Sequence, residues 1–77
     1  MMLILAYISA VAFDQVGKGG FTVSFGTSNA AYSSSLTFYV DLAGTEGEIE
    51  EAIRMKVVEA VNLALGTSLT SEDVRLF

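Results

Sequence analysis

One helical segment, marked at both of its ends, constrains the fold more than any other feature of this sequence. Residues 45–48 read Thr-Glu-Gly-Glu and match a capping box, in which the Thr45 hydroxyl accepts from the Glu48 backbone N–H and the Glu48 carboxylate reaches back. Gly66 stands where the helical pattern stops, and glycine commonly terminates helices. We therefore expect a helix over residues 46–65.

The apolar residues of this segment recur at helical spacing and predict one face that covers a sheet. That face comprises Ile49, Ala52, Ile53, Val57, Ala60, Val61 and Ala64. Val58 and Leu65 lie beyond Val61, on a flank that they share with Glu50 and Arg54. Two interpretations of this flank stand: an ordinary surface with a Glu50–Arg54 ion pair, or a contact with another subunit. We favour the contact because the chain as a whole is strongly apolar.

Apolar and polar residues alternate over residues 21–25 and again over residues 36–42, before the helix begins. This period of two is typical of half-buried strands. Residues 26–35 between them are small and polar without a period, which predicts a long loop. Residues 14–20 contain three glycines in four positions and predict a hairpin loop before the first of these strands.

The first thirteen residues are apolar on both faces of an extended strand, which favours a strand covered on both sides. Residues 3, 5, 7, 11 and 13 fall on one face, and the even-numbered residues fall on the smaller, alanine-rich face. The run is shorter than the roughly 20 residues that cross a bilayer. A cleaved leader is the other interpretation, since Ala10-Val11-Ala12 has the form of a cleavage site, but no basic residue precedes the run.

The last residues fit two structures. Residues 70–73 can cap a short helix, whereas residues 74–77 can form a strand beside the first one through a right-handed crossover. We favour the strand. The expected fold is α+β: a three-stranded antiparallel meander, one long helix in the C-terminal half packed on one face, and a fourth short C-terminal strand, in the order β-β-β-α-β. All 77 residues form one small domain.

The composition leaves little chemistry. With no Cys and no His, the chain has no thiol nucleophile, imidazole base or ordinary zinc site. Asp14 and Asp41 could form a carboxylate pair, but both stand at strand ends, and Lys18 among glycines lacks the spacing of a phosphate-binding loop. Helical spacing scatters the acidic residues at 46, 48, 50 and 51 rather than gathering them around a cation. We expect no enzyme, no cofactor and no metal.

The charge of the chain argues against nucleic acid as a partner. Four basic residues stand against nine acidic ones, giving a net charge of −5, and the four are scattered. Affinity for phosphate backbones comes from clustered cations. The composition does not fix a compartment, and it favours an intracellular or virion setting over secretion.

Apolar residues make up 52% of the chain and charged ones only 17%, which is more apolar than one sheet and one helix can hide. A chain this short, without disulfides or metal, usually gains stability from association. We therefore expect a homo-oligomer or contact with another protein. The candidate interface residues are Val58, Val61 and Leu65 on the helix, Thr22, Ser24, Thr37 and Tyr39 on the sheet, and Tyr32 in the loop.

These features favour a non-catalytic structural or assembly protein, acting as a homo-oligomer or as a subunit of a larger particle. The alternative is a small acidic inhibitor or adaptor that binds a basic surface on another protein. No motif identifies a family. In its small size, apolar composition and low charge the chain resembles accessory and virion components of phages and viruses, a likeness of composition alone.

Overall fold

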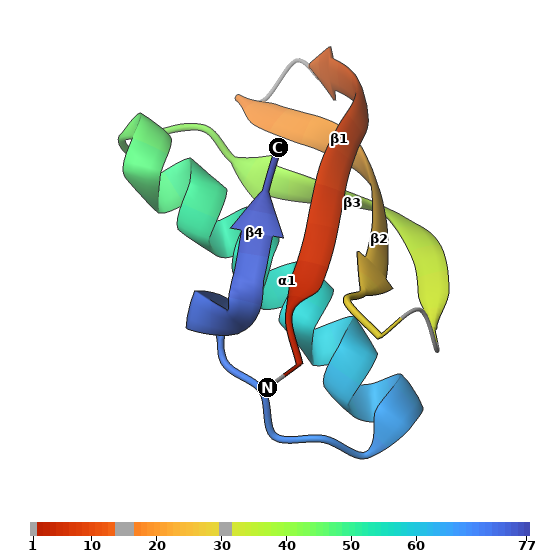
Figure 1. The fold of residues 1–77 in the computed structure, drawn as a ribbon. Helices are drawn as coiled ribbons and strands as arrows, with labels where there is room; N and C mark the ends of the chain where they lie inside the picture. Colours follow the sequence, from red (N-terminus) through yellow and green to blue (C-terminus); the bar gives the residue numbers. More distant parts are fainter. Residues whose placement is uncertain (1, 14–16, 30–31) are drawn as a thin grey trace.

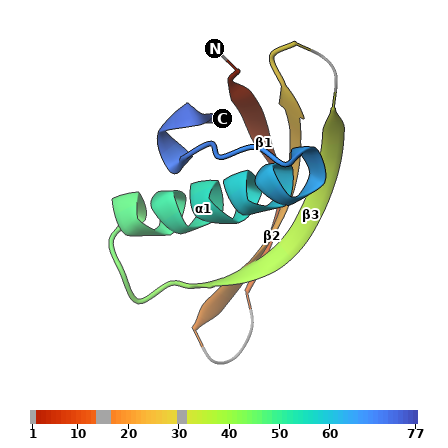
Figure 2. The same cartoon turned by 90° about the horizontal axis from the view of Figure 1, so that it is seen from below.

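A computed structural model describes residues 2–13, 17–29 and 32–77 of the chain. The described residues form one four-stranded sheet with a single long helix across one of its faces (Figures 1 and 2). The fold is α+β, and the predicted order β-β-β-α-β is confirmed. The elements are β1 (Ile4–Phe13), β2 (Lys18–Thr27), β3 (Ser33–Asp41), α1 (Glu46–Leu65), the 3₁₀ turn η1 (Ser71–Asp73) and β4 (Val74–Leu76).

The sheet is mixed, with the spatial order β3-β2-β1-β4. β1, β2 and β3 form an antiparallel meander, and β4 lies parallel to β1 after the chain has crossed over through α1. The Phe77 backbone N–H donates to the Ala6 carbonyl at 2.8 Å and so extends this pairing past β4. The structure contains both features considered for the tail: a short 3₁₀ turn, η1, is followed directly by the predicted strand.

The helix has the predicted limits. The Thr45 hydroxyl accepts from the Glu48 backbone N–H at 3.2 Å, and the Glu48 carboxylate accepts from the Thr45 backbone N–H at 3.4 Å. At the other end, Gly66 has a left-handed φ of 67°, a conformation that glycine adopts at little cost. Local sequence therefore defines both ends of α1.

The core lies between α1 and the sheet. The helix contributes a row of β-branched side chains, and every strand contributes at least one apolar side chain to the layer beneath it. The buried apolar residues are Ile4, Ala6, Phe21, Val23, Phe25, Val40, Ile53, Val57, Val58, Val61 and Val74. Val58 thus joins the face that was expected to cover the sheet, whereas Ala64 is exposed. No helix among the described residues has the length and apolar character needed to cross a membrane.

A β-bulge in β1 corrects the strict alternation expected there. The pairing of β1 with β2 shifts between Ile8 and Ala10, and the Ser9 hydroxyl donates to the Thr22 carbonyl at 3.0 Å. Tyr7 therefore pairs with exposed Ser24, whereas Val11 pairs with buried Phe21. Tyr7 and Val11 were expected on one face and lie on opposite faces, because one extra residue inverts the side-chain phase of a strand.

The strands run further than alternation alone predicted. The expected loop over residues 26–35 is shorter, since β2 continues to Thr27 and β3 begins at Ser33, with Gly26 paired to Ser33. Small polar residues sustain these ladders because strand pairing uses backbone groups. In the expected hairpin loop over 14–20, residues 14–16 lie outside the described part, Gly17 has a positive φ of 79°, and Gly19 and Gly20 belong to β2.

Asn62 holds the chain that returns from the helix to the sheet. It lies outside the apolar face predicted for this helix, yet it is half-buried. Its Nδ2 donates to the Leu69 carbonyl at 2.9 Å, while its Oδ1 accepts from the Leu69 N–H at 2.9 Å and from the Thr67 hydroxyl at 2.7 Å. One side chain thus fixes the turn that positions η1 and β4.

We expect Asn62→Ala to lower the free energy of unfolding by about 2 kcal/mol, because the polar groups of half-buried Leu69 lose their partner. Urea denaturation followed by circular dichroism measures this change. Glu59→Ala, at an exposed position on the same helix, serves as the control and should change stability by less than about 0.5 kcal/mol. Equal effects of the two substitutions would contradict the role assigned to Asn62.

Thr45→Ala should cost about 1 kcal/mol of stability, because it removes the hydroxyl that caps α1. Thr45→Ser keeps a capping hydroxyl, so its stability should stay close to that of the original protein. Thermal denaturation of the three proteins compares them directly. An unchanged melting temperature for Thr45→Ala would show that the cap does not limit stability.

Candidate interaction surfaces

The helix flank that was predicted as a contact is mostly interior. Val61 is fully buried, and Val58 is only 6% exposed, so both belong to the core of the protomer itself. This corrects the expected position of Val58 on an open flank: the turn held by Asn62 brings residues 67–71 back beside the helix. Leu65 remains 38% exposed and is the part of the predicted helix contact that another chain can reach.

The most exposed large apolar side chains of α1 lie elsewhere, at Met55 and Leu63. Together with Val58 and Leu69 they line a hollow of about 690 Å³ between the helix and the returning chain. Leu63 is 87% exposed at its rim. Sequence analysis missed this hollow because one of its walls is formed by the segment after the helix, and no spacing within α1 reveals that wall.

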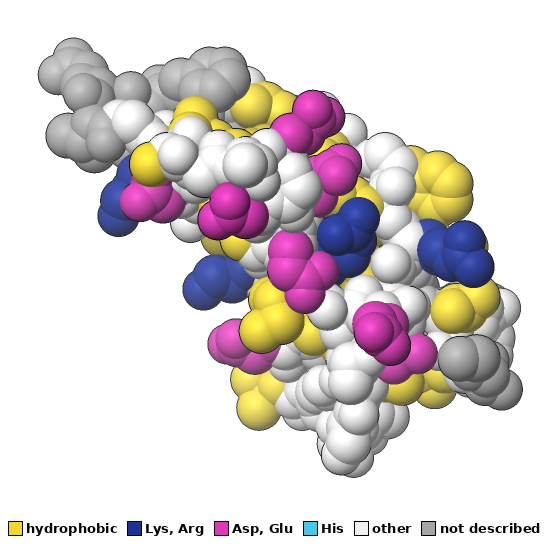
Figure 3. All heavy atoms as spheres, turned by 90° about the vertical axis from the view of Figure 1, so that its left-hand side faces the viewer, with side chains coloured by type: hydrophobic (Ala, Val, Ile, Leu, Met, Phe, Trp, Pro, Cys, Tyr) yellow, Lys and Arg dark blue, Asp and Glu magenta, His cyan; other side chains and the backbone are white. Residues whose placement is uncertain are grey.

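The ion pair on the helix differs from the expected one. Arg54 lies 3.5 Å from Glu51 rather than pairing with Glu50. The second Glu51 oxygen accepts from the Ser71 hydroxyl at 2.6 Å, so Glu51 joins α1 to η1. On the side of the molecule that carries β4 and the start of α1, acidic side chains are interspersed with basic ones (Figure 3).

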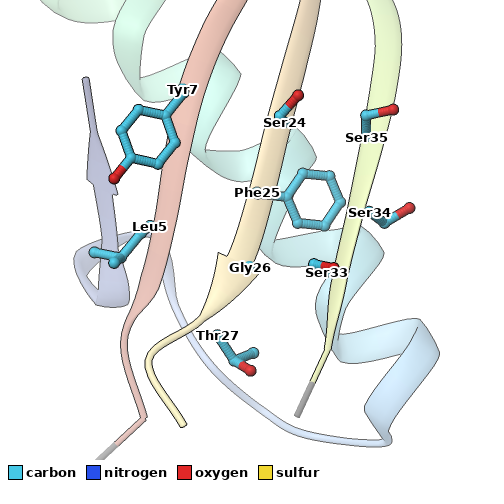
Figure 4. A pocket seen from close by; sticks show the side chains of 9 residues that line it. All are labelled: Leu5, Tyr7, Ser24, Phe25, Gly26, Thr27, Ser33, Ser34 and Ser35. Carbon is cyan, nitrogen blue, oxygen red and sulfur yellow. The ribbon is translucent and has the colours of Figure 1, made fainter. Parts of the chain in front are cut away.

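The face of the sheet opposite α1 is uncovered. Figure 1 views this face, with the helix behind it. The Tyr7 ring stacks on the Phe77 ring, with centroids 5.0 Å apart and planes inclined by 16°, and both rings are exposed. Beside Tyr7 lies an open hollow of about 680 Å³, floored by small residues of β2 and β3 (Figure 4). Its lining comprises Leu5, Tyr7, Ser24, Phe25, Gly26, Thr27, Ser33, Ser34 and Ser35.

The four sheet residues predicted to share a surface do lie on this uncovered face. Thr22 and Thr37 form a cross-strand pair whose hydroxyls are 3.1 Å apart, and Ser24 is exposed on the same strand as Thr22. Tyr39 is 62% exposed, and its ring lies over Gly20, where a Cβ atom would come within 3.0 Å of it. The centre of this face is therefore uncharged, while aromatic rings lie toward its margins. The strand registers place three charged residues at those margins as well: Lys18, Asp41 and Arg75.

Tyr32 does not lie free in a loop as expected. It is half-buried, its ring centroid is 6.3 Å from that of Phe25, and its carbonyl accepts from the Thr27 N–H at 2.9 Å. Tyr32 therefore helps to close the turn between β2 and β3 and packs against the core. Its ring is thus already packed within the protomer, and its role as a contact anchor stays a prediction.

The residues considered for chemistry are dispersed. Asp14 lies outside the described residues, and the Asp41 carboxylate accepts from the Ala43 N–H at 2.9 Å in the turn after β3. Lys18 opens β2, opposite Asp41 in the register. Within residues 2–13, 17–29 and 32–77, no group of three or more carboxylates is placed to hold a metal ion. What the described residues present is a set of surfaces suited to contact.

Comparison with known proteins adds no relative: no family model, no curated protein and no solved structure matches this chain. The residues and the geometry alone therefore carry the functional argument.

Val58→Asp should lower the free energy of unfolding by about 3 kcal/mol or more, because it places a carboxylate in the core. Leu63→Asp puts the same charge on the same helix, at the exposed rim of the hollow. It should change the free energy of unfolding by less than about 0.5 kcal/mol. Chemical denaturation compares the two. If Val58→Asp leaves stability unchanged, Val58 is a surface residue after all.

Proposed function

We propose that this chain is a non-catalytic structural or assembly protein that works as a homo-oligomer or as a subunit of a larger particle. One observation carries the proposal: α1 covers only one face of the sheet and leaves the other open, with an uncharged centre around Thr22 and Thr37 and with exposed Tyr7, Tyr39 and Phe77. Exposed aromatic rings in an uncharged setting are typical of surfaces that other chains cover. A viral or phage particle is the setting that the composition favours.

A second surface supports the same role. Met55 and Leu63 expose apolar side chains around the hollow on α1, away from the core. Contact surfaces on opposite layers of one protomer suit a subunit with neighbours on more than one side. An acidic inhibitor or adaptor remains the second candidate, supported by the net charge of −5. The mixing of charges visible in Figure 3 favours the assembly role, since electrostatic steering works best with a surface of one sign.

The mass of the purified protein in solution tests this proposal. Sedimentation velocity across the micromolar range should give a multiple of the 8.2 kDa protomer mass, with little change as salt is raised. A protein that stays monomeric at every concentration, with no exposed apolar surface detected by a fluorescent dye, would contradict self-assembly. Association with a basic partner that weakens steeply with salt would instead support the inhibitor or adaptor.

A further inference from the structure

We propose that two copies of this chain pair along β3, in antiparallel orientation about Thr37, and join their sheets into one. This inference rests on the proposed assembly role and names the surface through which two copies first associate. The strand order across the dimer would run β4-β1-β2-β3 and then β3-β2-β1-β4 of the second copy, with both helices on the same side.

The first argument is that β3 is an open edge. It is the outermost strand, nine residues long, and among the described residues its backbone pairs with β2 alone. The opposite edge, β4, is only three residues long. A long edge strand presents unpaired N–H and C=O groups, which another strand can satisfy.

The second argument is that β3 lacks the features by which proteins protect such edges. Natural edges carry lysines, prolines or bulges that prevent pairing. Residues 33–41 include no Lys, Arg or Pro, and the pairing of β3 with β2 runs from Ser33 to Asp41 without a register shift. β1, an interior strand, is where the bulge lies. The edge is therefore regular along its whole length, and no lysine, proline or bulge in it hinders pairing with another strand.

The third argument is that the strand complements itself. Thr37 is the middle residue of the nine, so an antiparallel alignment centred on it pairs every residue of β3 with one of the second copy. On the core side, half-buried Leu36 of one copy faces half-buried Phe38 of the other, twice by symmetry. On the uncovered side, Thr37 faces Thr37 and exposed Tyr39 faces Ser35. Aromatic and aliphatic cross-strand pairs of this kind stabilise sheets.

The geometry of the shared edge selects the antiparallel alignment, which also keeps the charged ends of the two strands apart. Asp41 is the one charged residue of β3 and stands at its end. To pair the same edge in parallel, the second copy must turn by 180° about the strand axis, which exchanges the two faces of its sheet. Its uncovered face would then continue the helix-covered face of the first copy, and the core-side residues Leu36 and Phe38 would lose each other as neighbours. The antiparallel alignment separates the two Asp41 positions by eight residues, or about 27 Å at roughly 3.4 Å per residue.

Single cysteines test the alignment, because the natural chain contains none. In Thr37→Cys the two thiols would face each other across the symmetry axis, within reach of a disulfide. In Ser33→Cys they would lie about 27 Å apart on the same edge. Ser24→Cys places a thiol on the same uncovered face but on interior strand β2. All three positions are exposed, and circular dichroism checks that each variant folds.

With oxidised glutathione at micromolar protein, we expect Thr37→Cys to form the covalent dimer at least about ten times faster than Ser33→Cys or Ser24→Cys on non-reducing gels. As a second measurement, Thr37→Lys should weaken dimerisation at least about tenfold, because two lysines would face each other, whereas Ser24→Lys should not. This pair keeps the inference testable if a cysteine variant fails to fold.

The possible results of these experiments test the β3 contact separately from the proposed assembly role. If the unmodified protein is oligomeric but Thr37→Cys cross-links no faster than Ser24→Cys, the copies meet elsewhere, at the uncovered face or the hollow on α1, and this inference is overturned alone. If Ser33→Cys cross-links as fast as Thr37→Cys, the alignment is not the antiparallel one. A strictly monomeric protein would overturn the proposed function together with the contact.

Discussion

The packing of α1 on one face of the sheet is the interaction on which the rest of this structure depends. Ile53, Val57 and Val61 press against Ile4, Ala6 and Val23 with almost no exposed surface. Among the residues that the structure describes, each of these layers has only the other to cover it. The same packing that stabilises the protomer therefore leaves the second face of the sheet open.

The return of the chain to the sheet depends on polar contacts as well as on apolar ones. The Asn62 side chain satisfies both backbone groups of Leu69, and Glu51 binds Ser71 at the start of η1. These bonds direct β4 to the free side of β1, where Val74 is buried. β1 thus becomes an interior strand, paired on both sides, and β3 is left as the long edge. The position of the open edge follows from where the last residues dock.

The uncovered face and the β3 edge share a chemical character, which is an uncharged centre. The uncovered face carries Thr and Ser at its centre, with aromatic rings and the charged residues Lys18 and Arg75 toward its margins. The edge strand β3 ends in its one charged residue, Asp41. Surfaces that must stay in water usually carry interspersed charges, as the side shown in Figure 3 does. The contrast between the uncharged centre of one side and the mixed charges of the other is the physical reason for proposing contact at the first.

Sequence alone determined the limits of α1 and the number and order of the strands, because capping at Thr45, termination at Gly66 and alternation in residues 21–25 act over a few residues. Only the tertiary structure decided the bulge at Ser9, the burial of Val58 and the uncovered face. These features depend on which distant segments meet: pairing with β2 sets the phase of β1, and the chain held by Asn62 folds back beside the helix. Periodicity describes one element at a time and carries no information about its neighbours.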